Sequence, residues 1–411
     1  MPNESLLKDR PKVYSVEFWR FLFTIIVALY HLEIFYQIKL MPSGTTAVEF
    51  FFVLAGFTIA MSASRRVQNG GERDASSKEA RTMAWVYLKK KLLAVYPILA
   101  LTLIIAIVVI PLAFPATQMF SGASSGSFWQ KLLERLGILA SSEWEWLNLV
   151  GTPMGFNEAS ASAAPIVPLW FLTQLLLVGY IYTYFVNRKY DLMMFLAPVI
   201  SVVGFTYFVL NSEKILDFYI QMGLFNAGTV RAITCMAMGI TIYQVYEYVK
   251  GRDWKLFGKI VFQLLELFAI YRYVVLTINA DISIDNFRRI PYILIIILLS
   301  FSNVTLLSKL LNRKFMEKLG NLSLTMYLIH FSVATVYWTW LFELKRAPRA
   351  WTLPGFIQSS GGMTIGYRPL PLSLGDLLMY IPFVIVVSVL INLMIKGIKT
   401  CLKKRRERTL S

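Results

Sequence analysis

Two ionisable residues, Arg20 and His31, lie in one long apolar stretch, Val16–Ile38, which also contains Glu17 and Glu33. A stretch of this length crosses a bilayer as a helix, and an ionisable residue inside such a span is a functional candidate because leaving it unpaired is costly. Arg20 and His31 are eleven residues apart. On an α-helix this spacing is about three turns plus 20°, so both side chains project from one face, roughly 16 Å apart along the axis. The pattern indicates a chemical path through the membrane along this helix.

Histidine is the most frequent general base, and a carboxylate from Glu33 or Glu49 would raise the basicity of His31 and define its tautomer. The alternative is a neutral histidine that is hydrogen-bonded to a neighbouring helix. His330, the only other histidine of the chain, also lies in an apolar stretch, where it could support the base, position an acceptor or simply pack. Arg20 could clamp a phosphate or carboxylate, or it could extend to the lipid headgroups.

Five more basic residues lie at the predicted inner ends of neighbouring spans, where they would add to an anion site around Arg20. They are Arg65, Arg66, Lys89, Lys90 and Lys91. Individually, such residues are explained by their effect on membrane topology. Their position close to an arginine inside a span favours an additional role in binding an anion.

The composition is that of a membrane protein. The chain has 411 residues, of which 56% are hydrophobic and 16% charged, and its mean hydropathy is +0.57. Soluble proteins are about one quarter charged. The net charge of +17 does not indicate nucleic-acid binding, because the basic residues lie mostly in short loops between apolar stretches, where they set topology. We therefore predict an all-α, polytopic protein of the cell membrane, whose surroundings are the lipid bilayer.

Metal and disulfide chemistry are not expected. The chain has two cysteines, Cys235 in an apolar stretch and Cys401 in a basic one, and its two histidines lack the spacing of metal ligands. The first apolar stretch lacks a small-residue cleavage site and contains ionisable residues, which favours a retained span over a signal peptide.

The apolar stretches predict ten transmembrane helices in a single domain, residues 1–411. The predicted spans are Val16–Ile38, Thr45–Ala63, Leu92–Phe114, Pro165–Phe185, Leu192–Leu210, Thr229–Tyr248, Leu256–Ile278, Ile290–Leu307, Leu322–Phe342 and Leu374–Ile395. Lys and Arg are more frequent in the loops on the side of the two termini, which places both termini in the cytoplasm. Residues 1–15 precede the helix bundle (16–395), a basic inner loop runs from Ser64 to Lys91, and residues 396–411 form a basic tail that lies against anionic headgroups.

The ordered motifs of the chain resemble those of the membrane acyltransferase-3 family over essentially the whole length. The matching segments are Glu17–Arg20 with His31, Glu49–Phe57, Tyr96–Pro97, Pro168–Leu172, Arg231 with Gly239, Leu319–Ser323 and Tyr327–His330. Ala55 replaces the serine of the family's Phe-Phe-x-Leu-Ser-Gly-Phe motif, and Leu175 occupies a position at which some members have glutamate. A mechanism that needs an acid at position 175 is therefore not supported here.

The resemblance implies an enzyme that moves an acyl group, commonly acetyl, from cytoplasmic coenzyme A to a hydroxyl of a glycan or lipid-linked sugar across the membrane. Acyl-CoA would be the donor, held by Arg20, the five-residue basic cluster and Tyr96 of the Tyr-Pro element. Trp170, Arg231 and Tyr327, which lie in matching motifs, are the expected acceptor-binding residues.

In this interpretation His31 acts as general base on the acceptor hydroxyl, or accepts the acyl group itself before passing it on. Two long outer loops, about residues 115–164 and 343–373, are expected to present the sugar. The first of these loops contains Trp129, Trp144 and Trp146, whose rings could stack on a sugar.

A transporter and an inactive membrane-bound sensor are the alternatives to an enzyme. In a transporter or flippase of an anionic or lipid-linked solute, Arg20 and His31 would form a proton relay or a substrate site. The motif set disfavours this class, as does the absence of repeat symmetry and of paired helices broken by Gly or Pro. A membrane-bound sensor that has lost acyltransferase activity is disfavoured because both Arg20 and His31 are present.

Overall fold

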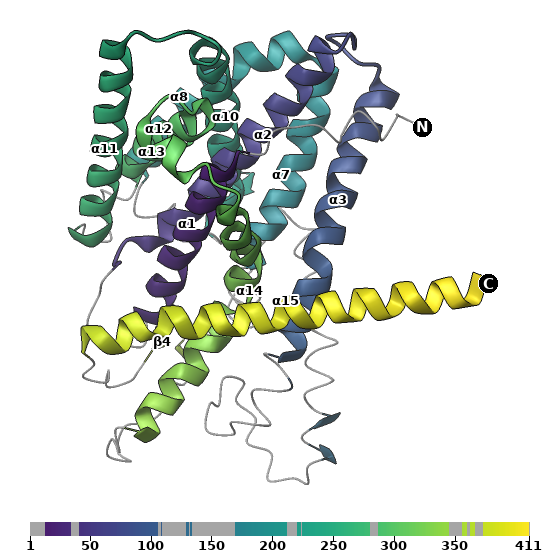
Figure 1. Ribbon diagram of the computed structural model, residues 1–411, viewed down its shortest axis with the longest axis vertical. Helices are drawn as coiled ribbons and strands as arrows, with labels where there is room; N and C mark the ends of the chain where they lie inside the picture. Colours follow the sequence, from purple (N-terminus) through teal and green to yellow (C-terminus); the bar gives the residue numbers. More distant parts are fainter. Residues whose placement is uncertain are drawn as a thin grey trace.

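The computed structural model of the chain is a bundle of helices with two short hairpins (Figure 1). The structure describes residues 13–33, 41–105, 108, 129–130, 132–133, 169–211, 220–222, 224–279, 287–344, 356–359, 362–365 and 373–410. The α-helices are α1 (Tyr14–Glu33), α2 (Ala47–Gln68), α3 (Ser77–Ile104), α7 (Leu169–Arg188), α8 (Tyr190–Leu210), α10 (Ala227–Val249), α11 (Leu256–Asn279), α12 (Ile290–Ser302), α13 (Leu306–Leu311), α14 (Phe315–Leu344) and α15 (Leu374–Leu410).

The remaining regular elements are short. Two 3-10 helices, η2 (Gly44–Thr46) and η5 (Phe287–Arg289), precede α2 and α12. Strand β1 (Gln221–Met222) pairs antiparallel with β2 (Phe225–Asn226), and β3 (Phe356–Ser359) pairs antiparallel with β4 (Gly362–Ile365). The helices, rather than these hairpins, position the residues discussed below.

Within the described residues, five segments are long and apolar enough to cross a membrane: Tyr14–Leu32, Gly44–Gln68, Tyr190–Leu210, Leu256–Asn279 and Leu374–Cys401. In the last three, only 22% of the most apolar window is buried inside the protein. Apolar surface on this scale needs a lipid environment or a partner to cover it. In the first two segments, 61% and 72% of that window is buried, so α1 and α2 form the centre of the bundle. The prediction of an all-α membrane protein is confirmed, and the crossing of the membrane by ten helices stays a prediction.

The helices differ from the predicted spans at three places. The stretch from Ser64 to Lys91 is mostly helical, because α2 continues to Gln68 and α3 starts at Ser77 after a capping box in which Ser76 and Glu79 bond each other's backbone amides. The span Ile290–Leu307 is interrupted after α12 by Asn303, whose φ of 54° is left-handed and ends the helix. The basic tail continues α15 as a helix to Leu410, because the backbone hydrogen bonds of a helix do not require an apolar environment.

The short loop of residues 69–76 is tied to the start of α8. Asp74 accepts hydrogen bonds from Lys189 Nζ (3.0 Å) and from the backbone amide of Tyr190 (3.1 Å). These bonds stabilise the carboxylate and lower the pKa of Asp74. The pKa of Glu79 is lowered in the same way by its bonds to Ser76. The bonds to Asp74 therefore hold the loop between α2 and α3 against the start of α8.

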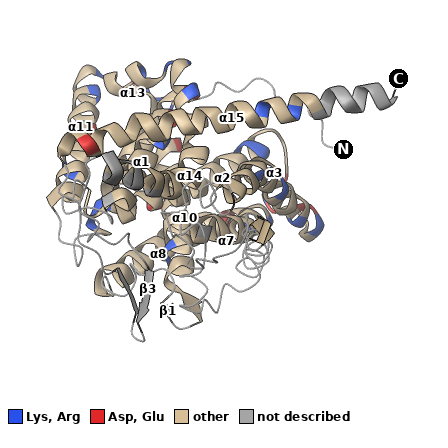
Figure 2. Ribbon diagram, turned by 90° about the horizontal axis from the view of Figure 1, so that it is seen from below, with Lys and Arg blue, Asp and Glu red and all other residues tan. Residues whose placement is uncertain are grey.

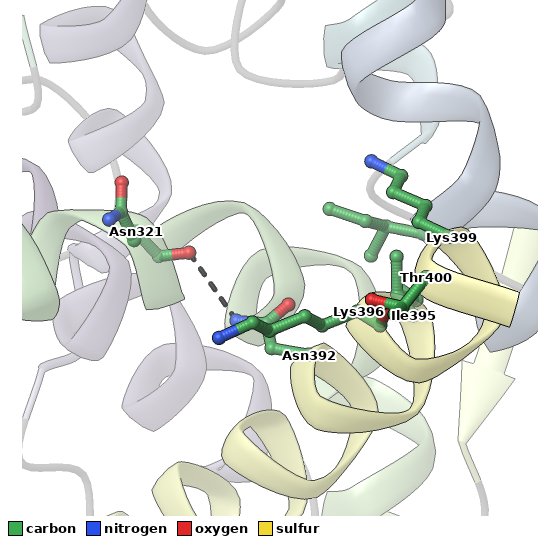
Figure 3. Close-up of a pocket in the computed structure, with 7 residues that line it drawn as sticks. Asn321, Asn392, Ile395, Lys396, Lys399 and Thr400 are labelled. Atoms are coloured by element: carbon green, nitrogen blue, oxygen red, sulfur yellow. Dashed lines mark hydrogen bonds between the residues drawn. The ribbon is translucent and has the colours of Figure 1, made fainter. Parts of the chain in front are cut away.

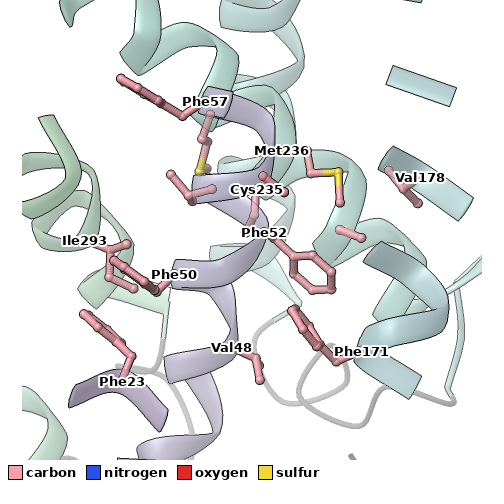
Figure 4. Packing of buried hydrophobic residues seen from close by; sticks show 14 of the residues in the cluster. Phe23, Val48, Phe50, Phe52, Phe57, Phe171, Val178, Cys235, Met236 and Ile293 are labelled. Atoms are coloured by element: carbon pink, nitrogen blue, oxygen red, sulfur yellow. The ribbon is translucent and has the colours of Figure 1, made fainter. Parts of the chain in front are cut away.

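Helix α2 packs against α1, α7, α10 and α12 through aromatic side chains that point in opposite directions (Figure 4). Phe50 stacks on Phe23 of α1 with ring centroids 4.2 Å apart, and Phe52 lies 4.6 Å from Phe171 of α7. Contact with α10 is closer still. A Cβ on Gly56 would lie 2.0 Å from the Met236 carbonyl oxygen, so the two backbones touch as in the small-residue crossings of membrane helices.

Candidate active site

A cavity of about 580 Å³ opens among α1, α2, α3, α7, α10, α12 and α14. Three basic side chains line it, Arg20 from α1, Arg65 from α2 and Lys91 from α3. The fold therefore brings together three residues that the sequence places in one anion site. Most of the other lining residues are apolar, among them Phe171 and Leu175. Such a cavity suits a ligand that has an anionic end and an extended neutral part.

Arg20 is held in place by its own helix and by α14. Its Nη1 atom donates a hydrogen bond to Glu17 Oε2 at 2.7 Å, and its side chain is 32% exposed. Gly320 of α14 makes room for this pair, because a Cβ there would lie 2.0 Å from Glu17 Oε2. The glycine of the Leu319–Ser323 motif thus allows Glu17 to orient the arginine that lines the cavity.

Arg66 lies elsewhere. Its Nε atom donates to Asn187 Oδ1 at 3.1 Å, and its Nη2 atom donates to the Arg73 carbonyl oxygen at 3.1 Å. A third bond joins Nη1 to the carbonyl oxygen of Glu72. Arg66 therefore holds the loop between α2 and α3 against the end of α7.

The remaining predicted donor-binding residues of α3 face outward. Lys89 and Lys90 are exposed, and Tyr96 is 50% exposed. They do not line the cavity as the structure describes it. Lys91 differs from its two neighbours because the turn of the helix directs it inward, where its Nζ atom also lies 5.8 Å from the ring of Tyr87.

Tyr327 of α14 connects the cavity to the two histidines. It is buried and lines the cavity, and its ring centroid lies 5.4 Å from that of Phe171 and 6.4 Å from that of Phe51. The same ring lies 5.9 Å from the imidazole of His330. Tyr327 is therefore a residue of the cavity wall that lies next to His330, and neither histidine lines the cavity as the structure describes it.

The imidazoles of His31 and His330 form a hydrogen-bonded pair. His330 Nε2 lies 3.1 Å from His31 Nδ1, and the ring centroids are 4.8 Å apart. His330 Nδ1 lies 2.7 Å from the Tyr327 carbonyl oxygen, and His31 Nδ1 lies 2.9 Å from that of Val27. The hydroxyl of Tyr380 donates to the His330 carbonyl oxygen at 2.6 Å and ties this turn of α14 to α15.

These partners assign the tautomers of the neutral pair. A carbonyl oxygen only accepts hydrogen bonds, so the proton of His330 lies on Nδ1, and its Nε2 atom accepts. His31 then donates from Nδ1 to His330 Nε2 and to Val27, which leaves His31 Nε2 without a proton. The arrangement supplies one oriented basic nitrogen, at His31 Nε2.

Glu49 and Arg231 form an ion pair in the interior. Arg231 Nε lies 2.6 Å from Glu49 Oε1, and the two side chains are 2% and 0% exposed. The guanidinium also lies 5.0 Å from the ring centroid of Trp170, and its Nη2 atom is 3.5 Å from the Thr45 carbonyl oxygen. Glu49, Arg231 and Trp170 thus form one cluster between α2, α10 and α7. The structure places the Glu49 carboxylate with Arg231, whereas the hydrogen-bond partners described for His31 are Val27 and His330.

Some of the predicted residues lie beyond the described parts of the chain. Glu33 ends α1, and its side chain is outside the described residues, as are Trp144, Trp146 and most of both long outer loops. Trp129 is described and is 69% exposed.

Sequence reasoning did not assign a role to two buried polar residues. Ser323 of α14 is 2% exposed and lines the cavity one turn before Tyr327, and its hydroxyl has no hydrogen-bond partner among the described residues. Its place in the Leu319–Ser323 motif was the only signal. Arg289 is fully buried and donates to the Ser43 carbonyl oxygen. From sequence, a basic residue at the start of a span is explained by its effect on membrane topology.

Comparison with known proteins identifies the family of the chain. The acyltransferase-3 family model, which describes an acyltransferase domain, matches residues 13–395. No curated protein and no solved structure matches the chain significantly. The matched region includes every residue of the cavity, the histidine pair and the Glu49–Arg231 cluster. The chain therefore belongs to the membrane acyltransferase-3 family.

Proposed function

We propose that this protein is an O-acyltransferase that moves an acyl group, with acetyl as the first candidate, from cytoplasmic acyl-CoA to a hydroxyl of a cell-surface or lipid-linked carbohydrate. The observation that supports this proposal best is the His31–His330 pair, which supplies one oriented base and is linked through Tyr327 to a cavity that has basic residues and apolar walls. The family supplies the reaction class.

The cavity offers complementary groups for the parts of acyl-CoA. Arg20, Arg65 and Lys91 would bind the phosphates, since guanidinium and ammonium groups form charge-assisted hydrogen bonds with phosphate oxygens. The apolar walls would cover the pantetheine arm. The buried hydroxyl of Ser323, which lacks a partner in the described chain, would bond to an amide of that arm.

The transfer itself needs one proton to move twice. His31 Nε2 accepts the proton of the acceptor hydroxyl, and the oxygen attacks the thioester carbonyl carbon. The carbon–sulfur bond then breaks, and the imidazolium returns the proton to the departing thiolate. His330 Nε2 accepts a hydrogen bond from His31 Nδ1 and so stabilises the imidazolium. A route in which His31 Nε2 itself takes the acyl group first uses the same nitrogen.

The Glu49–Arg231–Trp170 cluster is proposed to shape the acceptor side of the site. Arg231 already pairs with Glu49 and covers the ring of Trp170. Together with Arg289 it bonds the backbone carbonyls of the turn that precedes α2. The cluster would therefore position the wall that the sugar meets, rather than supply a free charge.

We further propose that the chain spans the cell membrane ten times with both termini in the cytoplasm. This topology places Arg20 near the inner surface and His31 in the outer half of α1. The donor phosphates would then bind on the inner side, and the acceptor hydroxyl would approach from the outer side.

The test is acyl transfer by the purified protein in lipid vesicles, with radiolabelled acetyl-CoA on one side of the membrane and candidate glycans on the other. Label should appear in an alkali-labile ester, and His31→Ala should abolish this product while the melting temperature stays unchanged. Normal transfer by a folded His31→Ala variant would reject the mechanism. Movement of a solute across the vesicle membrane without ester formation would identify a transporter instead.

A further inference from the structure

A second cavity lies outside the candidate active site, in a groove between α3, α14 and α15 (Figure 3). Its volume is about 730 Å³. The polar lining consists of Asn321 from α14 and of Asn392, Lys396, Lys399 and Thr400 from α15. Nothing in the proposed reaction uses this groove. We propose that it binds the phosphate headgroup of an anionic membrane lipid.

The groove exists because α15 separates from α14 at this point. Thr325 Oγ1 donates to Asn392 Oδ1 at 2.6 Å, and Asn392 Nδ2 lies 3.5 Å from the Asn321 carbonyl oxygen. Beyond these contacts, α15 continues past α14 toward the side of the bundle on which α3 lies (Figures 1 and 2). The space between α14, α15 and α3 is then open to a ligand.

The charge of the groove matches a phosphate. Lys396 and Lys399 are three residues apart on one helix and therefore share a face, and both side chains extend toward the open space in Figure 3. Neither forms a salt bridge with any residue that the structure describes, and the lining includes no acidic side chain. Asn321 also lines the groove, and its amide is a neutral hydrogen-bonding group.

The apolar surroundings favour a lipid over a soluble phosphate. Ile98 and Ile395 line the groove beside the lysines. On the preceding turns of α15, Leu390, Leu393 and Met394 are each more than half exposed, as expected of a surface that contacts acyl chains. The junction between this apolar surface and Lys396 is where the headgroup of a lipid lies when its chains follow the helix.

The site proposed for the soluble phosphates of CoA is separate from this groove. The candidate active site offers Arg20, Arg65 and Lys91 on α1, α2 and α3, and it shares no lining residue with the groove. The lipid proposal therefore does not depend on the proposed enzymatic function, and it remains testable if no acyl transfer is found.

The test uses the full chain in nanodiscs of phosphatidylcholine, with and without phosphatidylglycerol, followed by native mass spectrometry of the lipid that stays bound. The wild-type protein should retain phosphatidylglycerol, and the double variant K396Q/K399Q should retain about tenfold less. The matched control is K403Q/K404Q, which removes the same charge from the same helix beyond the groove. This control should retain lipid as the wild type does.

Three results would overturn the proposal. Equal loss in the two double variants would mean that the tail attracts lipid only through its overall charge. Displacement of the lipid by millimolar inorganic phosphate would indicate a site for a free anion. Weaker binding of CoA by K396Q/K399Q, with lipid retention unchanged, would assign the groove to the nucleotide.

Discussion

The Nε2 atom of His330 lies 3.1 Å from the Nδ1 atom of His31, although 299 positions of the chain separate the two residues. Each ring also bonds a backbone carbonyl of its own helix, so the proton positions of the neutral pair follow from geometry. The basic nitrogen of the site is therefore defined by a helix that lies near the other end of the sequence.

Substitution of either histidine should affect acyl transfer. His31→Ala should lower kcat by about 10²- to 10⁴-fold, which is the usual contribution of a general base. His330→Gln keeps an acceptor for His31 Nδ1 and should lose less activity than His330→Leu, which keeps none. The measurement is steady-state acyl transfer at saturating donor, with the melting temperature of each variant as control. Equal activity of the Gln and Leu variants would show that the hydrogen bond does not orient the base.

Lys90 and Lys91 provide a matched pair for the donor site. Each change to glutamine removes one positive charge from adjacent positions of α3, but of the two residues only Lys91 lines the cavity. Lys91→Gln should raise the KM for acyl-CoA by about tenfold through loss of a charge-assisted hydrogen bond, while Lys90→Gln should change it by less than about twofold. Both KM values should be measured at low and high salt, because the effect of an exposed charge is screened. Equal effects would assign donor binding to the general positive surface.

Gly320 should be sensitive to the smallest substitution. The methyl group of Gly320→Ala would lie 2.0 Å from Glu17 Oε2, so Glu17 must move and Arg20 loses its hydrogen-bond partner. We expect a loss of about 1–3 kcal/mol in stability and a raised KM for the donor. The control is Gly397→Ala on α15, where no atom lies within 4 Å of the new methyl group. This change should leave stability unchanged or raise it by about 0.5–1 kcal/mol.

The ion pair between Glu49 and Arg231 should show strong coupling. Arg231→Met alone leaves a carboxylate buried without its partner and should cost about 3–5 kcal/mol. Adding Glu49→Gln removes that charge and should restore a large part of the loss. A double-mutant cycle on melting temperatures in one detergent measures the coupling. Additive effects would mean that the two side chains do not interact in the folded protein.

The native cysteines test the proposed topology. Cys401 is exposed on α15, whereas Cys235 is fully buried in α10, so a thiol reagent should modify only Cys401. With the C-terminus in the cytoplasm, a membrane-impermeant maleimide should label Cys401 in permeabilised cells but not in intact cells. Cys401→Ser should abolish labelling. Labelling of intact cells would place this end of α15 outside and reverse the direction of transfer.

Much of the helical architecture follows from sequence alone. A membrane requires that backbone polar groups be satisfied within each segment, so a long apolar stretch forms a helix whatever its neighbours are. For the same reason, the sequence alone predicts that Arg20 and His31 lie on one helix, about three turns apart. Hydropathy did not predict the break at Asn303, because a single left-handed residue does not change the apolar pattern. It did not predict the early start of α3 either, because the capping box lies outside the apolar stretch.

The contacts of the candidate site depend on tertiary structure. The sequence placed Arg20, Arg65 and Lys91 at the same membrane surface, but it did not distinguish Lys91 from Lys89 and Lys90. In a membrane helix both the lipid-facing and the buried side are apolar, so periodicity does not reveal which side faces the bundle. The sequence therefore determined which residues could do chemistry, and packing decided that His31 meets His330 and Glu49 meets Arg231.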